Sequence, residues 1–170
     1  MKIVIFGCQQ IAVNVIKYLS TLDDVSLSLV ITYELPLDQT YGYESVIKLC
    51  EGKNIKVINP KSLNKDVTQK IIEISPDIIL SIYYRKILSK ELINLPNLGC
   101  INIHPSYLPY YRGPVPTAWA IENGETQFGI TIHYMDEGMD TGDILVQEKH
   151  EINDNETGYE LYTRGMTLGF

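Results

Sequence analysis

An amide and an imidazole are spaced for carbonyl chemistry in the segment Asn102-Ile103-His104. In an extended strand, side chains two residues apart point to the same side, so Asn102 and His104 project together while Ile103 faces away. Both polar groups can donate a hydrogen bond to an oxyanion that develops on a carbonyl oxygen. The same pattern also suits two side chains that only hydrogen-bond nearby backbone groups, and the residues alone leave both interpretations open.

A group of carboxylates follows in the turn-rich stretch 136–143: Asp136, Glu137, Asp140 and Asp143. Glycines within this stretch permit the tight bends that can place one carboxylate in a site. A carboxylate facing His104 would raise the pKa of the imidazole and could accept a proton from a nucleophile. The stretch lacks the alternate ligand positions of a calcium loop, so metal binding is disfavoured. The remaining alternative is a solvated turn.

The segment Gly7-Cys8-Gln9-Gln10 is a candidate phosphate site, because backbone N–H groups between a strand and a helix can bind an anion. It lacks the repeated glycines of a dinucleotide fingerprint, which disfavours NAD binding. Arg85 and Arg112 could bind a phosphate or a carboxylate, or form surface ion pairs instead. Cys8 and Ser106 are possible nucleophiles, but Ser106 lacks a G-x-S-x-G context and Cys8 has no evident partner base.

Two further sets of residues can be interpreted as structural. His133 and His150 lie in alternating, strand-like segments and are interpreted as structural. Five tyrosines in two expected loops could line a pocket for a flat ligand, or could simply pack in the ordinary way: Tyr83, Tyr84, Tyr107, Tyr110 and Tyr111.

The elements that must position these residues alternate between strands and helices over the first hundred residues. Buried β-branched runs predict strands at 2–6, 25–31, 55–58, 77–81 and 99–103. Helical spacing predicts helices at 11–19, 43–50, 67–74 (with Ser62 as the N-cap) and 90–95. This alternation predicts a Rossmann-like α/β fold, with helices on both faces of a mostly parallel, twisted sheet. Ligands bind beyond the carboxyl ends of such strands, where Asn102 and His104 lie.

The order of elements changes after His104. Four prolines predict an irregular loop over 105–116, which is followed by a helix at 117–122. Strands are expected at 127–135 and 143–150 with no helix between them, which predicts an antiparallel addition to the sheet near the C-terminus. A last helix is expected to begin at Glu156.

Composition narrows the class of protein. A length of 170 residues, 45% of them hydrophobic, suits one globular domain. The net charge of −7 argues against a free-standing nucleic-acid binder. The three cysteines make no disulfide framework, and no targeting signal or membrane span is recognisable, so a soluble, cytoplasmic protein is expected.

Three segments resemble the signatures of the 10-formyltetrahydrofolate-dependent formyltransferases: Asn102 to Pro109 (NIHPSYLP), Tyr111 to Gly113 (YRG) and Asp136 to Gly142 (DEGMDTG). That family includes glycinamide ribonucleotide, methionyl-tRNA and sugar N-formyltransferases. The resemblance extends from the first strand to about residue 160. Its most specific part is the N-x-H element with an aspartate 36 residues after the histidine.

The resemblance implies one Rossmann-like catalytic domain over residues 1–170, apparently without the usual C-terminal extension. It implies transfer of a formyl group from 10-formyltetrahydrofolate, a co-substrate, to an amine, with no metal. Asn102 and a protonated His104 would stabilise the oxyanion. Asp140 would keep His104 charged and assist proton removal from the amine.

The resemblance also implies binding residues. Folate binding falls to two segments: Ser81, Ile82, Tyr83, Tyr84 and Arg85, then Asp136, Glu137, Gly138 and Met139. Binding of the amine substrate falls to Gly7, Cys8, Gln9, Gln10, Ser106, Tyr107 and Arg112.

Among the branches, the sequence favours the sugar N-formyltransferases, because the segment Ser81 to Arg85 is similar to one in that branch. The expected acceptor is then a nucleotide-linked amino sugar, with a dideoxy 4-amino sugar as the predicted type, as in lipopolysaccharide O-antigen biosynthesis. Nucleic acid and membrane are not expected as partners, and a homodimer is possible. The alternatives are a methionyl-tRNA formyltransferase-like or other amine formyltransferase, or a truncated folate-binding form with little turnover.

Overall fold

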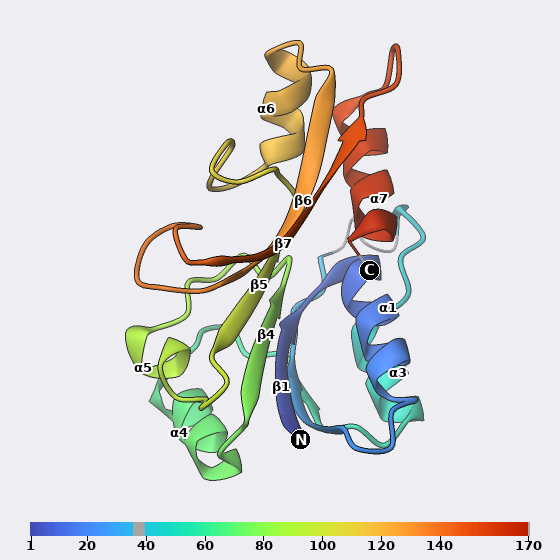
Figure 1. The fold of residues 1–170 in the computed structure, drawn as a ribbon. Helices are drawn as coiled ribbons and strands as arrows, with labels where there is room; N and C mark the ends of the chain where they lie inside the picture. Colours follow the sequence, from blue (N-terminus) through green and yellow to red (C-terminus); the bar gives the residue numbers. More distant parts are fainter. Residues whose placement is uncertain (36–39, 170) are drawn as a thin grey trace. The chain divides into compact units, whose positions relative to one another are not determined.

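The computed structural model describes residues 1–35 and 40–169, which fall into two compact units, Met1–Ile101 and Asn102–Phe170. Four parallel strands form the sheet of the first unit: β1 (Lys2–Gly7), β2 (Ser26–Ile31), β3 (Val57–Ile58) and β4 (Ile78–Ile82). Figure 1 shows α1 (Gln9–Leu19) and α3 (Val46–Gly52) on one face of this sheet, and α4 (Lys65–Ile74) and α5 (Lys90–Ile93) on the other.

Strand β1 is central in the first unit, where it pairs with both β2 and β4. The four consecutive residues from Ile3 to Phe6 are almost completely buried. A strand covered by helices on both faces buries every side chain, which is why this segment reads as a continuous apolar run.

Two helices have N-caps that the sequence does not predict. Asn64, not Ser62, is the N-cap of α4, and its side chain accepts a hydrogen bond from the backbone N–H of Val67 at 3.1 Å. Ser45 caps α3 in the same way, through the N–H of Lys48. A capping oxygen reaches the N–H two or three residues ahead, so the cap is set by where the helix starts and not by the nearest serine.

The second unit contains an antiparallel hairpin of β6 (Gln127–Tyr134) and β7 (Ile144–Glu151). Helices α6 (Pro116–Glu122) and α7 (Gly158–Leu168) contact each other and β6. Buried Phe128, Ile130 and Leu161 form the core between these elements. A capping box between Thr157 and Glu160 begins α7.

The boundary between the units falls within β5 (Cys100–His104). The strand order is β3-β2-β1-β4-β5-β6-β7, with β6 and β7 as the antiparallel pair. This confirms the predicted fold class, including the antiparallel addition near the C-terminus. Among the described residues, no helix is long and apolar enough to cross a membrane.

Gly129 lets the loop that follows β5 lie directly against β6. A Cβ at this position would be 2.6 Å from the Cβ of Tyr107 and 2.9 Å from the carbonyl oxygen of Glu148. We therefore expect Gly129→Ala to lower the free energy of unfolding by about 1–3 kcal/mol through overpacking. Gly158→Ala is the matched control, because a Cβ there would meet Ala118 at an ordinary 3.6 Å. Urea unfolding of both variants measures the difference, and equal stabilities would contradict the close approach.

Candidate active site

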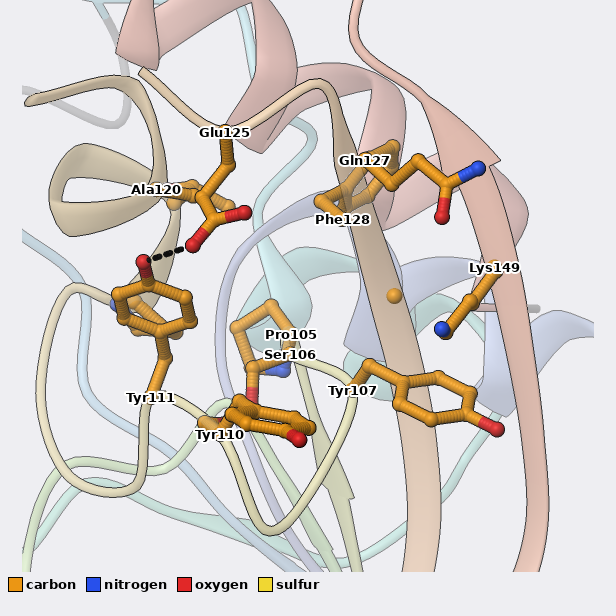
Figure 2. Close-up of a pocket in the computed structure, with 13 residues that line it drawn as sticks. Pro105, Ser106, Tyr107, Tyr110, Tyr111, Ala120, Glu125, Gln127, Phe128 and Lys149 are labelled. Carbon is orange, nitrogen blue, oxygen red and sulfur yellow. Dashed lines mark hydrogen bonds between the residues drawn. The ribbon is translucent and has the colours of Figure 1, made fainter. Parts of the chain in front are cut away.

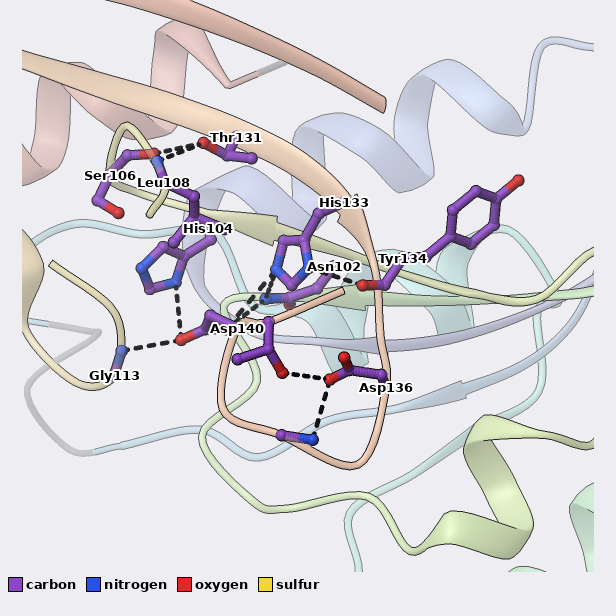
Figure 3. Close-up of polar contacts among 12 residues, drawn as sticks. Asn102, His104, Ser106, Leu108, Gly113, Thr131, His133, Tyr134, Asp136 and Asp140 are labelled. Carbon is purple, nitrogen blue, oxygen red and sulfur yellow. Dashed lines mark hydrogen bonds and ion pairs between the residues drawn. The ribbon is translucent and has the colours of Figure 1, made fainter. Parts of the chain in front are cut away.

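The second unit brings Asn102, His104 and Asp140 together (Figure 3). One carboxylate oxygen of Asp140, Oδ2, lies 3.6 Å from Nδ1 of His104. The other, Oδ1, accepts a hydrogen bond from the amide nitrogen of Asn102 at 3.4 Å. The strand geometry of β5 therefore places the amide and the imidazole as the sequence predicts, and the distant aspartate joins them.

The turn between β6 and β7 holds the carboxylate of Asp140 in place. Asp140 has a positive φ of 51°, and its Oδ2 accepts a 2.8 Å hydrogen bond from the backbone N–H of Gly113. Asp136 stabilises the same turn, because its Oδ1 accepts from the hydroxyl of Thr141 and the N–H of Gly138. At Gly142 a Cβ would collide with the carbonyl oxygen of Tyr134, so only glycine fits this bend.

His133 is a site residue that sequence reasoning interpreted as structural. It is 1% exposed, and its Nε2 lies 3.6 Å from Oδ1 of Asp140. The contact of Nδ1 with the Tyr134 carbonyl oxygen, at 2.7 Å, assigns the proton to Nδ1. Nε2 is then an acceptor for the Asn102 amide at 3.2 Å. The alternation of side chains along β6 predicts only that His133 lies on the buried face. It could not predict the contact with Asn102, because Asn102 lies on another strand, β5.

Asp140 is ionised in this environment. Burial by itself would raise the pKa of the carboxyl group. The contact with His133, the proximity of His104 and the N–H of Gly113 outweigh burial, and together hold the pKa below its usual value. Asp140 therefore remains an anion across the physiological range.

The pKa of His104 differs from the sequence prediction. Its side chain is almost fully buried, and this desolvation lowers the pKa of the imidazole. Asp140 and the carbonyl oxygen of Tyr111, 3.0 Å from Nε2, favour the charged form but do not offset burial. The sequence predicts that Asp140 keeps His104 charged, whereas here burial opposes the charged form more strongly than Asp140 favours it, so the pKa of His104 lies below its usual value.

The loop after β5 carries the predicted substrate residues Ser106 and Tyr107. Thr131 anchors this loop to β6: its hydroxyl donates to the carbonyl oxygen of Ser106 at 2.6 Å and accepts from the N–H of Leu108 at 3.1 Å. Ser106 and Tyr107 line a cavity of about 250 Å³ within the second unit (Figure 2), whereas Arg112 is exposed and is not among the residues that line it.

The tyrosines divide between the two interpretations that the sequence leaves open. In the first unit Tyr83 and Tyr84 are at most 9% exposed, and the ring of Tyr84 packs against Phe6 at 5.3 Å. Burial raises the pKa of Tyr84 to about 12. These two tyrosines are core residues. The other three of these five tyrosines, in the second unit, instead line the cavity: Tyr107, Tyr110 and Tyr111.

Two predicted binding segments of the first unit contact each other. The thiol of Cys8, at the start of α1, donates to the carbonyl oxygen of Tyr83 at 2.8 Å. Gln10 instead binds Asn14 along its own helix. In the described part of the chain, no group of three or more histidine, cysteine or acidic side chains could hold a metal ion.

Comparison with known proteins identifies the family. The family model described as formyl transferase matches residues 1–169. The chain belongs to the formyl transferase family. It is 38% identical to the methionyl-tRNA formyltransferase of Clostridioides difficile, covering 99% of this chain and 56% of that protein. It is 41% identical to that of Carboxydothermus hydrogenoformans, covering 95% and 53%. The chain thus spans about half the length of these curated relatives.

Solved structures confirm the formyltransferase fold. Phosphoribosylglycinamide formyltransferase from Bacillus halodurans superposes with a TM-score of 0.82 at 25% identity, covering 99% of this chain and 89% of that one. WlaRD, a sugar 3N-formyltransferase, has a TM-score of 0.76 at 27% identity, covering 99% and 58%. The WlaRD structure was solved with dTDP and 5-N-formyl-THF, so the expectation of a formylated folate is confirmed at the level of the family.

The branch chosen from the sequence is wrong. Sugar N-formyltransferases are among the structural relatives, but at 25–28% identity, whereas the curated methionyl-tRNA formyltransferases reach 38% and 41% over almost the whole chain. The comparisons therefore favour the methionyl-tRNA alternative over an amino-sugar acceptor and an O-antigen role. They also overturn the exclusion of nucleic acid, because the substrate of these relatives is a tRNA.

The electrostatics of the site can be tested by NMR titration of the imidazoles. Because Asp140 favours the charged form of His104 and burial opposes it, Asp140→Asn should lower the pKa of His104 further below its ordinary value of about 6.5. His150, which lies 3.6 Å from Glu148 instead, provides an internal reference, because at any given pH its chemical shift should be the same in the native chain and in Asp140→Asn. A His104 pKa that rises in Asp140→Asn would contradict the assignment.

Proposed function

We propose that this chain carries the catalytic centre of a methionyl-tRNA formyltransferase, which transfers the formyl group of 10-formyltetrahydrofolate to the amino group of methionyl-tRNA. The observation that carries the proposal is the contact of Asp140 with both Asn102 and His104. It occurs in a chain that is 38–41% identical to methionyl-tRNA formyltransferases. Residues 1–170 are proposed to act as one catalytic domain, located in the cytoplasm.

His104 and Asp140 are proposed to take the proton that the attacking amine loses. The amine nitrogen bonds to the formyl carbon, and the bond from that carbon to the folate nitrogen breaks as this nitrogen receives the proton taken from the amine, which leaves a formamide and tetrahydrofolate. Nε2 of His104 faces the carbonyl oxygen of Tyr111, so Nδ1 is the nitrogen that can accept a proton. Asp140 then faces the new imidazolium at 3.6 Å and stabilises it.

Asn102 is proposed to donate to the oxyanion on the formyl oxygen. Its amide nitrogen contacts Nε2 of His133 at 3.2 Å and Oδ1 of Asp140 at 3.4 Å. An amide nitrogen has two hydrogens, so donation to substrate requires the exchange of one contact. The longer contact, to Asp140, is the one we expect to give way, while His133 keeps the amide oriented.

Binding of the two substrates is proposed for the residues inferred from the resemblance. The folate would contact Ser81, Ile82, Tyr83, Tyr84 and Arg85 after β4, and Asp136, Glu137, Gly138 and Met139 in the β6–β7 turn. Because Tyr83 and Tyr84 are buried, their contribution would come from the backbone. The amine substrate would contact Gly7, Cys8, Gln9 and Gln10, together with Ser106, Tyr107 and Arg112.

The proposed function predicts formation of formylmethionyl-tRNA by the purified chain with 10-formyltetrahydrofolate. Replacing Asp140 by Asn removes the anion that stabilises the imidazolium, so we expect kcat to fall by about 10²–10⁴. Asp143→Asn is the matched control: this exposed residue lies three positions further along the same connection, and its variant should keep normal turnover. Single-turnover assays measure both. Equal rates for Asp140→Asn and the native chain would disprove the assigned role.

A further inference from the structure

The cavity of the second unit is lined by residues other than Asn102, His104 and Asp140. Its apolar part comes from buried Phe128 on β6 and from Pro116 and Ala120 on α6. Its charged lining consists of Glu125 and Lys149. With a volume of about 250 Å³, it accommodates a single planar ring system with a short polar extension.

Aromatic faces and a cation lie on one side of this cavity. The ammonium nitrogen of Lys149 is 4.3 Å from the ring centroid of Tyr107, so the cation and the ring are held together. Figure 2 shows this ammonium group turned toward the cavity. Tyr110, on the same loop, is 66% exposed although a tyrosine ring gains free energy when it is covered.

A hydrogen-bond acceptor lies on the opposite side. Oε1 of Glu125 accepts from the hydroxyl of Tyr111 at 2.6 Å, which holds the carboxylate in one orientation. The second carboxylate oxygen keeps its own lone pairs, and Figure 2 shows it turned away from Tyr111. It can therefore accept from an amino group on a planar ligand.

We propose that this cavity binds one nucleotide of the single-stranded 3′ end of the RNA acceptor. The base stacks on Tyr110 and Tyr107, its exocyclic amino group donates to Glu125, and a phosphate pairs with Lys149. Stacking on tyrosine combined with a cation for the backbone is how proteins hold single-stranded nucleic acid. The inference rests on the proposed function, because it identifies the acceptor as an RNA.

The cavity also has a direct connection to the catalytic histidine. Pro105, which lines it, is the residue after His104, and the carbonyl oxygen of Tyr111, another lining residue, faces Nε2 of His104 at 3.0 Å. A nucleotide in the cavity therefore binds the same loop that contacts the reacting centre. Binding there orients the end of the acceptor strand without adding a group to the chemistry.

Steady-state kinetics with methionyl-tRNA test the proposal. Loss of one stacking contact in Tyr110→Ala should raise KM by about 5- to 150-fold while kcat stays near normal. Tyr110→Phe keeps the ring and should restore the native KM. Lys149→Ala should raise KM and reduce the slope of log KM against log salt by about 0.7. Tyr159→Ala and Lys53→Ala, exposed residues that do not line the cavity, are the matched controls.

Direct binding separates the possible sources of the nucleotide. A labelled RNA oligonucleotide that ends in CCA should bind the native chain and lose affinity in Tyr110→Ala, whereas AMP should bind much more weakly. AMP that binds as tightly as the oligonucleotide would assign the cavity to a free nucleotide and overturn the RNA assignment. Unchanged KM and oligonucleotide affinity in both variants would also overturn it. Oligonucleotide binding at Tyr110 without formylation of methionyl-tRNA would refute the proposed function and leave the cavity assignment standing.

Discussion

The carboxylate of Asp140 receives contacts from four groups that come from three parts of the second unit. The amide of Asn102, the imidazoles of His104 and His133, and the backbone N–H of Gly113 converge on its two oxygens. Gly113 belongs to the loop after β5, the two histidines to β5 and β6, and Asp140 to the turn before β7. Because one anion joins these elements, the orientation of each polar group depends on the charge of Asp140.

Burial and charge act against each other at this centre. Desolvation favours neutral forms of both Asp140 and His104, yet only Asp140 gains enough hydrogen bonds and nearby positive character to stay ionised. The result is a neutral imidazole beside a fixed anion. A pair of this kind can take up a proton during the reaction, because the anion stabilises the charge that appears on the histidine.

The prediction of binding partners from net charge shows how a property of the whole chain can mislead. A net charge of −7 argued against nucleic acid, but recognition depends on where charge lies and not on its sum. In the second unit the cavity beside the catalytic loop combines Lys149 with the exposed ring of Tyr110. Similarly, the likeness of Ser81 to Arg85 to a sugar-modifying branch rests on five residues, whereas identity to the methionyl-tRNA enzymes extends over almost the whole chain.

The sequence by itself determined the fold class and the position of nearly every strand, because these depend on local periodicity, which any single chain displays. Strand alternation also predicted that Asn102 and His104 project together, whereas Asp140 was chosen from four nearby carboxylates only by resemblance to a family. Only the tertiary structure decided that His133 joins the cluster, that Tyr84 is core while Tyr110 is exposed, and that burial lowers the pKa of His104. Those properties depend on burial and on partners from other strands, because desolvation and hydrogen bonding act between atoms that only folding brings within reach.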